Sequence, residues 1–148
     1  MTSESQFSVA DSRVVVIGAA RSGVAAAELL VKRGARVVLS EALCHVDGLS
    51  QLQAAGVGIE VGGHRPETLA SADLVVLSPG VSPSLPVIDQ IRRRGTPVIS
   101  EVELAARWLR GRIVAVTGTK GKSTTTLLTG RMLDADGRTV VVGGNVGT

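Results

Sequence analysis

The chain has 148 residues, of which 44% are hydrophobic and 20% are charged, and its formal net charge is +3. This length is enough for one domain of ordinary size, or for one domain and part of another. The composition is typical of a globular protein and excludes a disordered chain. The longest apolar run, from Val14 to Ala20, is far shorter than the ~20 residues that cross a bilayer.

Several further classes of protein are excluded by the residue types present. The first residues have neither a basic start nor an apolar stretch, so we expect a cytoplasmic protein rather than a secreted one. The single cysteine, Cys44, excludes an internal disulfide. One phenylalanine, one tryptophan and no tyrosine argue against the stacking platforms that bind single-stranded nucleic acid. The basic run at 92–94 fits a helix end better than a nucleic-acid patch, and His45 and His64 fall in predicted loops, where we expect exposed residues rather than metal ligands.

Short runs rich in valine and isoleucine alternate with helical stretches along the chain. These runs are mostly apolar on both faces, which is typical of parallel strands covered on both sides. The predicted strands are Arg13–Ile17, Arg36–Ser40, Val57–Val61, Asp73–Ser78, Thr96–Ile99, Ile113–Thr117 and Thr139–Val142. The predicted helices are Ser22–Arg33, Leu49–Ala55, Leu85–Arg94, Glu101–Leu109 and Lys122–Asp134. The alternation predicts an α/β fold with a doubly wound, mostly parallel sheet.

The organisation along the chain predicts a disordered tail over 1–12 and a Rossmann-like domain over 13–111. A strand-loop-helix-strand unit follows over 112–148. Because one two-stranded unit cannot bury a core of its own, this unit either extends the first sheet or opens a second domain. In the second case the chain is expected to be a fragment of a longer protein.

The strongest chemical signal is the stretch from Thr117 to Thr124, which follows an apolar run and opens a predicted helix. A glycine-rich loop at a helix N-terminus directs backbone N–H groups and partial positive charge at one point, which suits a phosphate. In this pattern Lys122 is expected to reach the β- and γ-phosphates of a nucleotide and Ser123 to bind Mg²⁺. The first glycine lies two positions later than in the usual phosphate loop, so the alternative is a strand-helix turn with a surface lysine. The expected ATP-binding residues are Gly118, Thr119, Lys120, Gly121, Lys122, Ser123 and Thr124.

A second glycine-rich loop, Gly18 to Gly23, occupies the position of a dinucleotide fingerprint between the first strand and the first helix. Ala20 replaces the glycine that normally lets the backbone approach a pyrophosphate, which makes the usual NAD pose less favourable. Glu41, at the end of the second strand, remains able to bond a ribose hydroxyl. Nucleotide binding and a purely structural turn both stay open for this loop.

Two more turns follow predicted strands. The turn Ser78-Pro79-Gly80 can offer backbone N–H groups and a hydroxyl to an anion, and Asn145, within a glycine-rich segment, can donate and accept hydrogen bonds. Each is as easily a simple turn when considered alone. Because all four glycine-rich turns follow the carboxyl ends of predicted strands, a binding edge is favoured over four unrelated turns.

The sequence resembles the Mur ligases, ATP-dependent enzymes that build the peptide of the bacterial cell-wall precursor. The resemblance rests on the order GxxxSG, SPGV, SEVELA, TGTKGKST and GGNVG, and it runs from about Arg13 to Thr148. This order is most similar to the branch that adds D-glutamate to UDP-N-acetylmuramoyl-L-alanine. The family has a Rossmann-like first domain for the UDP substrate, a P-loop ATP-binding domain and a third domain, so the resemblance implies that this chain holds the first domain and the opening of the second.

The resemblance also implies roles for individual residues. The UDP-substrate-binding residues would be Gly18, Arg21, Ser22, Gly23, Glu41, Ser78, Pro79, Gly80 and Asn145. Lys122 would be the catalytic residue that holds the ATP phosphates, and Ser123 would be the magnesium ligand. Lys120 stands where an asparagine is common in the family.

The implied reaction is phosphoryl transfer followed by acyl transfer. The γ-phosphate of ATP would activate the substrate carboxylate as an acyl phosphate, and the amine of D-glutamate would then displace phosphate, leaving ADP and phosphate as products. The resemblance places the remaining catalytic groups beyond Thr148, so we expect the chain alone to have no ligase activity. We also expect it to be a monomer. The alternatives are an NAD-binding or nucleotide-sensing Rossmann module without ligase activity, a module that binds UDP compounds only, and an unrelated P-loop ATPase.

Overall fold

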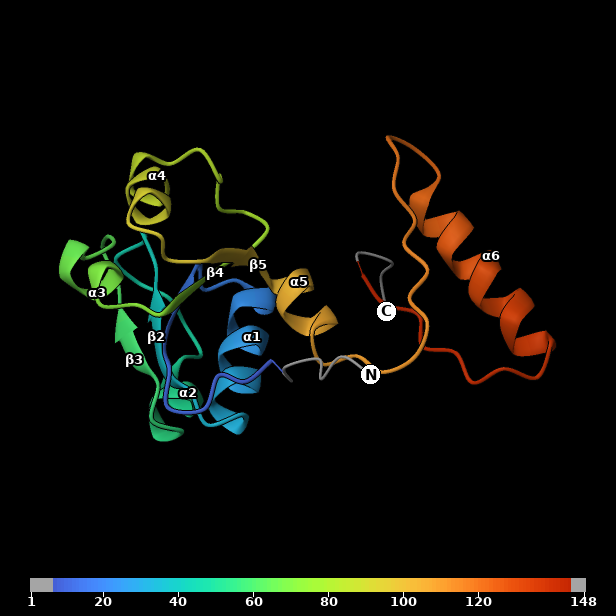
Figure 1. The fold of residues 1–148 in the computed structure, drawn as a ribbon, viewed down its shortest axis with the longest axis horizontal. Coiled ribbons are helices and arrows are strands. Elements are labelled where there is room, and N and C mark those ends of the chain that lie inside the picture. Colours follow the sequence, from blue (N-terminus) through green and yellow to red (C-terminus); the bar gives the residue numbers. More distant parts are fainter. Residues whose placement is uncertain (1–6, 145–148) are drawn as a thin grey trace, which may run out of the picture. The chain divides into compact units, whose positions relative to one another are not determined.

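The structure, a computed structural model, describes residues 7–144, and these fall into two units that divide between Leu109 and Arg110. The first unit contains a parallel sheet, which in the described residues has five strands in the order β3-β2-β1-β4-β5 (Figure 1). The strands are β1 (Arg13–Ile17), β2 (Arg36–Ser40), β3 (Gly58–Glu60), β4 (Leu74–Leu77) and β5 (Val98–Ser100). The helices of this unit are α1 (Arg21–Lys32), α2 (Ser50–Ala54), α3 (Pro66–Ala70), α4 (Pro86–Arg93) and α5 (Glu101–Ala106). The predicted α/β class with a doubly wound parallel sheet is therefore confirmed.

Apolar side chains of β1 point alternately to the two faces of the sheet, and helices cover both faces. Val14 and Val16 belong to a core cluster with buried residues of α1, α2 and α5, such as Leu30. Val15 and Ile17 point to the other face and join a second cluster with buried residues of α3 and α4. Successive side chains of a strand alternate between faces, so an unbroken apolar strand needs a layer of helices on each side.

The helices of the first unit agree with the predicted ranges to within a few residues. The short helix α3 was not predicted, because it contains one large apolar residue, Leu69, and so shows no helical spacing of apolar positions. Proline stands in the first turn of both α3 and α4, where the missing N–H has no helical partner to lose. Ser100 is the N-cap residue of α5, and its Oγ accepts the N–H of Glu103 at 3.1 Å.

The predicted disordered tail is wrong for residues 7–12. Val9 is buried, with 2% of its surface exposed, and the rings of Phe7 and Trp108 lie 5.3 Å apart between centroids. The Trp108 indole N–H also donates to the backbone oxygen of Phe7 at 3.3 Å. No local pattern in the sequence indicates this packing, because the contact joins positions 101 residues apart.

The second unit contains α6 (Lys122–Ala135), preceded by the glycine-rich loop. The two predicted strands beside it, 113–117 and 139–142, are wrong, because neither segment is a strand in the structure. Val114 and Val141 are 64% and 93% exposed. A strand needs a neighbouring strand to bond, and within the described residues of this unit neither segment has one.

Candidate functional site

The carboxyl ends of β2, β1 and β4 lie at one edge of the sheet, which we call the site edge. The strand order reverses direction there. β1 pairs with β2 on one side and with β4 on the other, so the chain winds outward both ways from β1. In open α/β sheets, ligands bind outside the carboxyl ends of the strands at such a point. The loop from Gly18 follows β1 and the turn from Ser78 follows β4, so the structure brings these two predicted site segments together. Their contact is direct, because the Ser78 hydroxyl donates to the backbone oxygen of Gly18 at 3.0 Å.

The packing of this loop depends on two glycines. Gly18 has φ of +99°, a conformation that side chains disfavour. A Cβ on Gly23 would lie 1.9 Å from the backbone oxygen of Gly18 and 2.5 Å from the Ser78 Oγ. The first turn of α1 therefore approaches the loop more closely than any side chain at Gly23 would allow, and the loop is a tight structural turn whatever it binds.

The N-terminus of α1 points its first backbone N–H groups toward the same edge. Its N-cap residue, Ala20, has no side-chain oxygen to accept them. The side chain of Arg21 is exposed and Ser22 is half-buried, both in the first turn. Such an end offers hydrogen-bond donors and partial positive charge, which an anion can use.

The turn after β4 is divided between buried and exposed residues. Ser78 is only 3% exposed and its hydroxyl is engaged by Gly18. Pro79 and Gly80 are exposed, and a Cβ on Gly80 would meet nothing within 4 Å. Pro79 and Gly80 are therefore accessible to a ligand, while the Ser78 hydroxyl already has a partner inside the protein.

Glu41, at the end of β2, turns back to the glycine-rich loop. Its Oε2 accepts the N–H of Ala19 at 2.7 Å and its Oε1 accepts the N–H of Leu43 at 3.1 Å. Burial raises the pKa of this carboxyl, but the N–H groups of Ala19, Leu43 and Ala42, together with the charge of His64, outweigh burial, and the pKa of Glu41 is lowered. The carboxylate form is thus favoured by the contacts that hold the loop.

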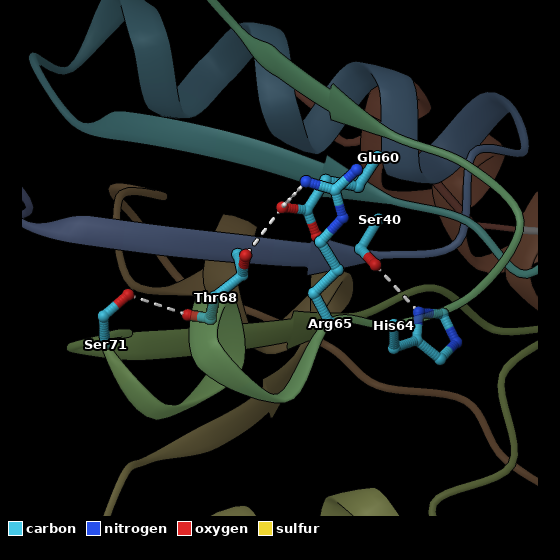
Figure 2. A network of polar contacts seen from close by, with 6 residues as sticks. All are labelled: Ser40, Glu60, His64, Arg65, Thr68 and Ser71. Carbon is cyan, nitrogen blue, oxygen red and sulfur yellow. Dashed lines mark hydrogen bonds and ion pairs between the residues drawn. The ribbon is translucent and has the colours of Figure 1, made fainter.

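A polar network at the ends of β2 and β3 was missed from the sequence (Figure 2). The Ser40 hydroxyl and Nδ1 of His64 lie 2.8 Å apart in a hydrogen bond, although the sequence predicted an exposed loop histidine. Arg65 and Thr68 turn toward Glu60 instead, and the Thr68 hydroxyl donates to Oε1 of Glu60 at 2.6 Å. One feature of the sequence could have indicated this contact. His64 comes shortly after a predicted strand, and residues that follow parallel strands lie together at one edge of the sheet.

Two glycines of the loop before α6 have positive φ. Gly118 has φ of +145° and Gly121, the N-cap residue, has φ of +77°. The Lys122 ammonium donates to the backbone oxygen of Gly118 at 2.6 Å and approaches that of Thr119 at 3.5 Å. The Lys122 side chain therefore folds back onto the loop that precedes α6. Three other residues near the start of α6 are exposed: Lys120, Ser123 and Thr124.

Asn145 lies outside the residues that the structure describes. Among residues 7–144, no group of three or more His, Cys, Asp or Glu side chains is arranged to hold a metal ion. Over the same residues, none of the helices has the length and apolar character that crossing a membrane requires.

The sequence profile of the family described as "Mur ligase MurD-like, N-terminal domain" matches residues 12–100. The chain belongs to this family. The resemblance to Mur ligases is thereby confirmed, and the matched range contains all five strands of the sheet and the turns at its edge.

Similar proteins extend the likeness into the second unit. The chain is 51% identical over 140 residues to a UDP-N-acetylmuramoylalanine–D-glutamate ligase of Anaeromyxobacter dehalogenans, covering 93% of this chain and 30% of that protein. It is 41% identical over 143 residues to the ligase of the same name from Koribacter versatilis, covering 95% of this chain and 32% of that protein. The chain thus spans about a third of the length of the curated relatives it matches.

Solved structures of Mur ligases resemble the fold. A murein peptide ligase from Psychrobacter arcticus matches with a TM-score of 0.60 and 27% identity, over 85% of this chain and 27% of that chain. The UDP-N-acetylmuramate-alanine ligase MurC from Thermotoga maritima matches with a TM-score of 0.55 and 25% identity, over 90% of this chain and 32% of that chain.

Proposed function

We propose that this chain is the N-terminal part of an ATP-dependent amide ligase of peptidoglycan precursor synthesis. The reaction is the addition of D-glutamate to UDP-N-acetylmuramoyl-L-alanine through an acyl phosphate, with ADP and phosphate as products. The observation that carries this proposal is the identity of 41% to 51% to ligases of that name, over more than nine-tenths of the chain. We place the enzyme in the cytoplasm, where its nucleotide substrates are found.

The first unit is proposed to bind the UDP substrate at the edge formed by Gly18, the first turn of α1 and the turn after β4. The N–H groups of Arg21, Ser22 and Gly23 provide donors for a diphosphate, and the Arg21 side chain adds a positive charge. Pro79 and Gly80 form the opposite, accessible wall.

The second unit is proposed to bind ATP with the loop from Gly118 to Thr124. Lys122 orients the β- and γ-phosphates and offsets their charge, which is the main contribution that a protein makes to phosphoryl transfer. In the structure its ammonium already lies on the loop, so a phosphate needs only to replace the carbonyl of Gly118 as its partner.

Magnesium suits the donor set in this loop. Mg²⁺ is usually held by one or two protein oxygens, with phosphates and water completing the octahedron. Ser123 offers one hydroxyl oxygen in the first turn of α6, next to Lys122. The bound ion would supply further neutralisation of phosphate charge.

Calorimetric titration of this chain tests the proposal. We expect heat of binding with UDP-N-acetylmuramoyl-L-alanine and with Mg-ATP, and none with NAD. Lys122→Ala should abolish the Mg-ATP signal and leave the UDP compound bound, because the two ligands use different units. Arg131→Ala is the matched control, since it removes an exposed cation from the same helix. Binding of NAD but not of the UDP compound would refute the proposal in favour of a dinucleotide-binding module.

A further inference from the structure

One peptide group at the site edge is held from both of its ends. The carbonyl of Gly18 accepts the Ser78 hydroxyl at 3.0 Å, and the N–H that belongs to the same peptide group, that of Ala19, donates to Glu41 at 2.7 Å. Ser78 comes from the end of β4 and Glu41 from the end of β2, on opposite sides of β1. We call this arrangement the peptide clamp.

We propose that Glu41 and Ser78 are positioning residues of the UDP-substrate site, which fix the orientation of the Gly18–Ala19 peptide and do not bind the ligand themselves. This inference rests on the proposed function for the identity of the ligand. It differs from the roles that the resemblance implied, in which both side chains contact the UDP substrate directly.

The bonds of Glu41 and Ser78 support a positioning role. Each carboxylate oxygen of Glu41 already accepts a backbone N–H, one from Ala19 and one from Leu43. The Ser78 side chain is buried and its hydroxyl proton is donated to Gly18. An acidic residue that binds a ribose at this place in dinucleotide folds presents its oxygens to the sugar, whereas these oxygens face the loop.

The loop needs such a clamp because of its own backbone. Gly18 has no side chain to limit its rotation, and its φ of +99° is one of many conformations open to a glycine. Rotation of the Gly18–Ala19 peptide would exchange a carbonyl for an N–H at the binding edge. It would also move the oxygen against which the first turn of α1 packs at Gly23.

The clamp also determines which donors remain for a ligand. The Gly18 N–H continues the sheet by donating to the backbone oxygen of Ser40 at 2.8 Å, and the Ala19 N–H is taken by Glu41. The donors that remain lie further along, in the first turn of α1. An anion is therefore directed to the helix end and away from the start of the loop.

The first experiment measures amide hydrogen exchange of Ala19 by NMR and needs no ligand. In Glu41→Gln the Ala19 N–H loses its charged acceptor, and exchange at Ala19 should be about tenfold faster or more. In Ser78→Ala the Gly18 carbonyl of the same peptide group loses a neutral hydrogen bond, and exchange at Ala19 should be roughly 2–10-fold faster. Glu28→Gln, an exposed carboxylate in α1, is the matched control and should leave Ala19 exchange unchanged. Fluorescence of Trp108 verifies that each variant is folded. Unchanged exchange in both clamp variants would overturn the inference.

The second experiment measures affinity for UDP-N-acetylmuramoyl-L-alanine in a double-mutant cycle. Each single variant should bind about tenfold more weakly, and the double variant should bind little more weakly than either, because both residues hold one peptide group. Independent, multiplying losses of affinity would show that the two side chains contact the ligand separately and would overturn the inference. If the unmodified chain fails to bind this compound, the proposed function fails, while the exchange experiment still decides whether the clamp exists.

Discussion

Substitution of Gly23 by alanine tests the close approach of α1 to the glycine-rich loop. The added methyl carbon would lie 1.9 Å from the backbone oxygen of Gly18, so either the helix end or the loop must move. We expect overpacking of this kind to cost about 3 kcal/mol, the upper end of the usual range, because the atom it meets is backbone. Loss of the bond between Ser78 and Gly18 adds about 1 kcal/mol, and the helix preference of alanine over glycine returns about 1 kcal/mol.

The expected net loss is therefore about 3 kcal/mol in the free energy of unfolding. Urea unfolding followed by fluorescence of Trp108, the single tryptophan, reports on the first unit. With a denaturant slope of about 1–3 kcal/mol/M, the midpoint should fall by roughly 1–3 M. Gly80→Ala is the control, because its Cβ meets nothing within 4 Å. Equal stability of Gly23→Ala and the unmodified chain would refute the packing argument.

Three further predictions concern other contacts of the first unit. Ser100→Ala should lower the free energy of unfolding by about 1 kcal/mol, since it removes the side-chain cap of the Glu103 N–H; Ser100→Asp should restore most of it in the same urea assay. Phe7→Ala should destabilise the unit by about 1–2 kcal/mol and alter the emission of Trp108, because the two rings are in contact; unchanged emission would contradict this packing. Because the pKa of Glu41 is lowered on folding, its contribution to stability is present above the unfolded pKa of about 4.3 and is lost as pH falls through the lower folded pKa. The advantage of the unmodified chain over Glu41→Gln in urea unfolding should accordingly shrink below about pH 4, and a constant difference would contradict the assignment.

The β-strand pattern of the first unit was predictable because burial on both faces leaves a direct mark on the sequence. The apolar run from Val14 to Ile17 has no polar position that could face water, which requires helices on both sides of the sheet. Turn glycines were equally visible. Gly34 and Gly95 follow helices and adopt positive φ, the conformation that the sequence pattern anticipates.

Contacts across the sheet edge were not predictable in the same way. The sequence placed Glu41 and Ser78 at the correct edge, because the carboxyl ends of parallel strands meet there. It did not reveal that both side chains bond the Gly18–Ala19 peptide, since the two residues lie on different strands and no local pattern records their partners. The bond between Ser40 and His64 was missed for the same reason.

The sequence by itself determined the α/β class, the order of the five strands of the first unit, the family resemblance and the glycine-rich loop before α6. These depend on local patterns of apolar residues, glycines and charged residues, which neighbouring positions express directly. Only the tertiary structure decided that the predicted strand 113–117 is not a strand in this chain and that Glu41 faces a backbone amide. A strand exists only with a partner, and a side chain's role depends on the groups around it, so both are properties of distant residues brought together by folding.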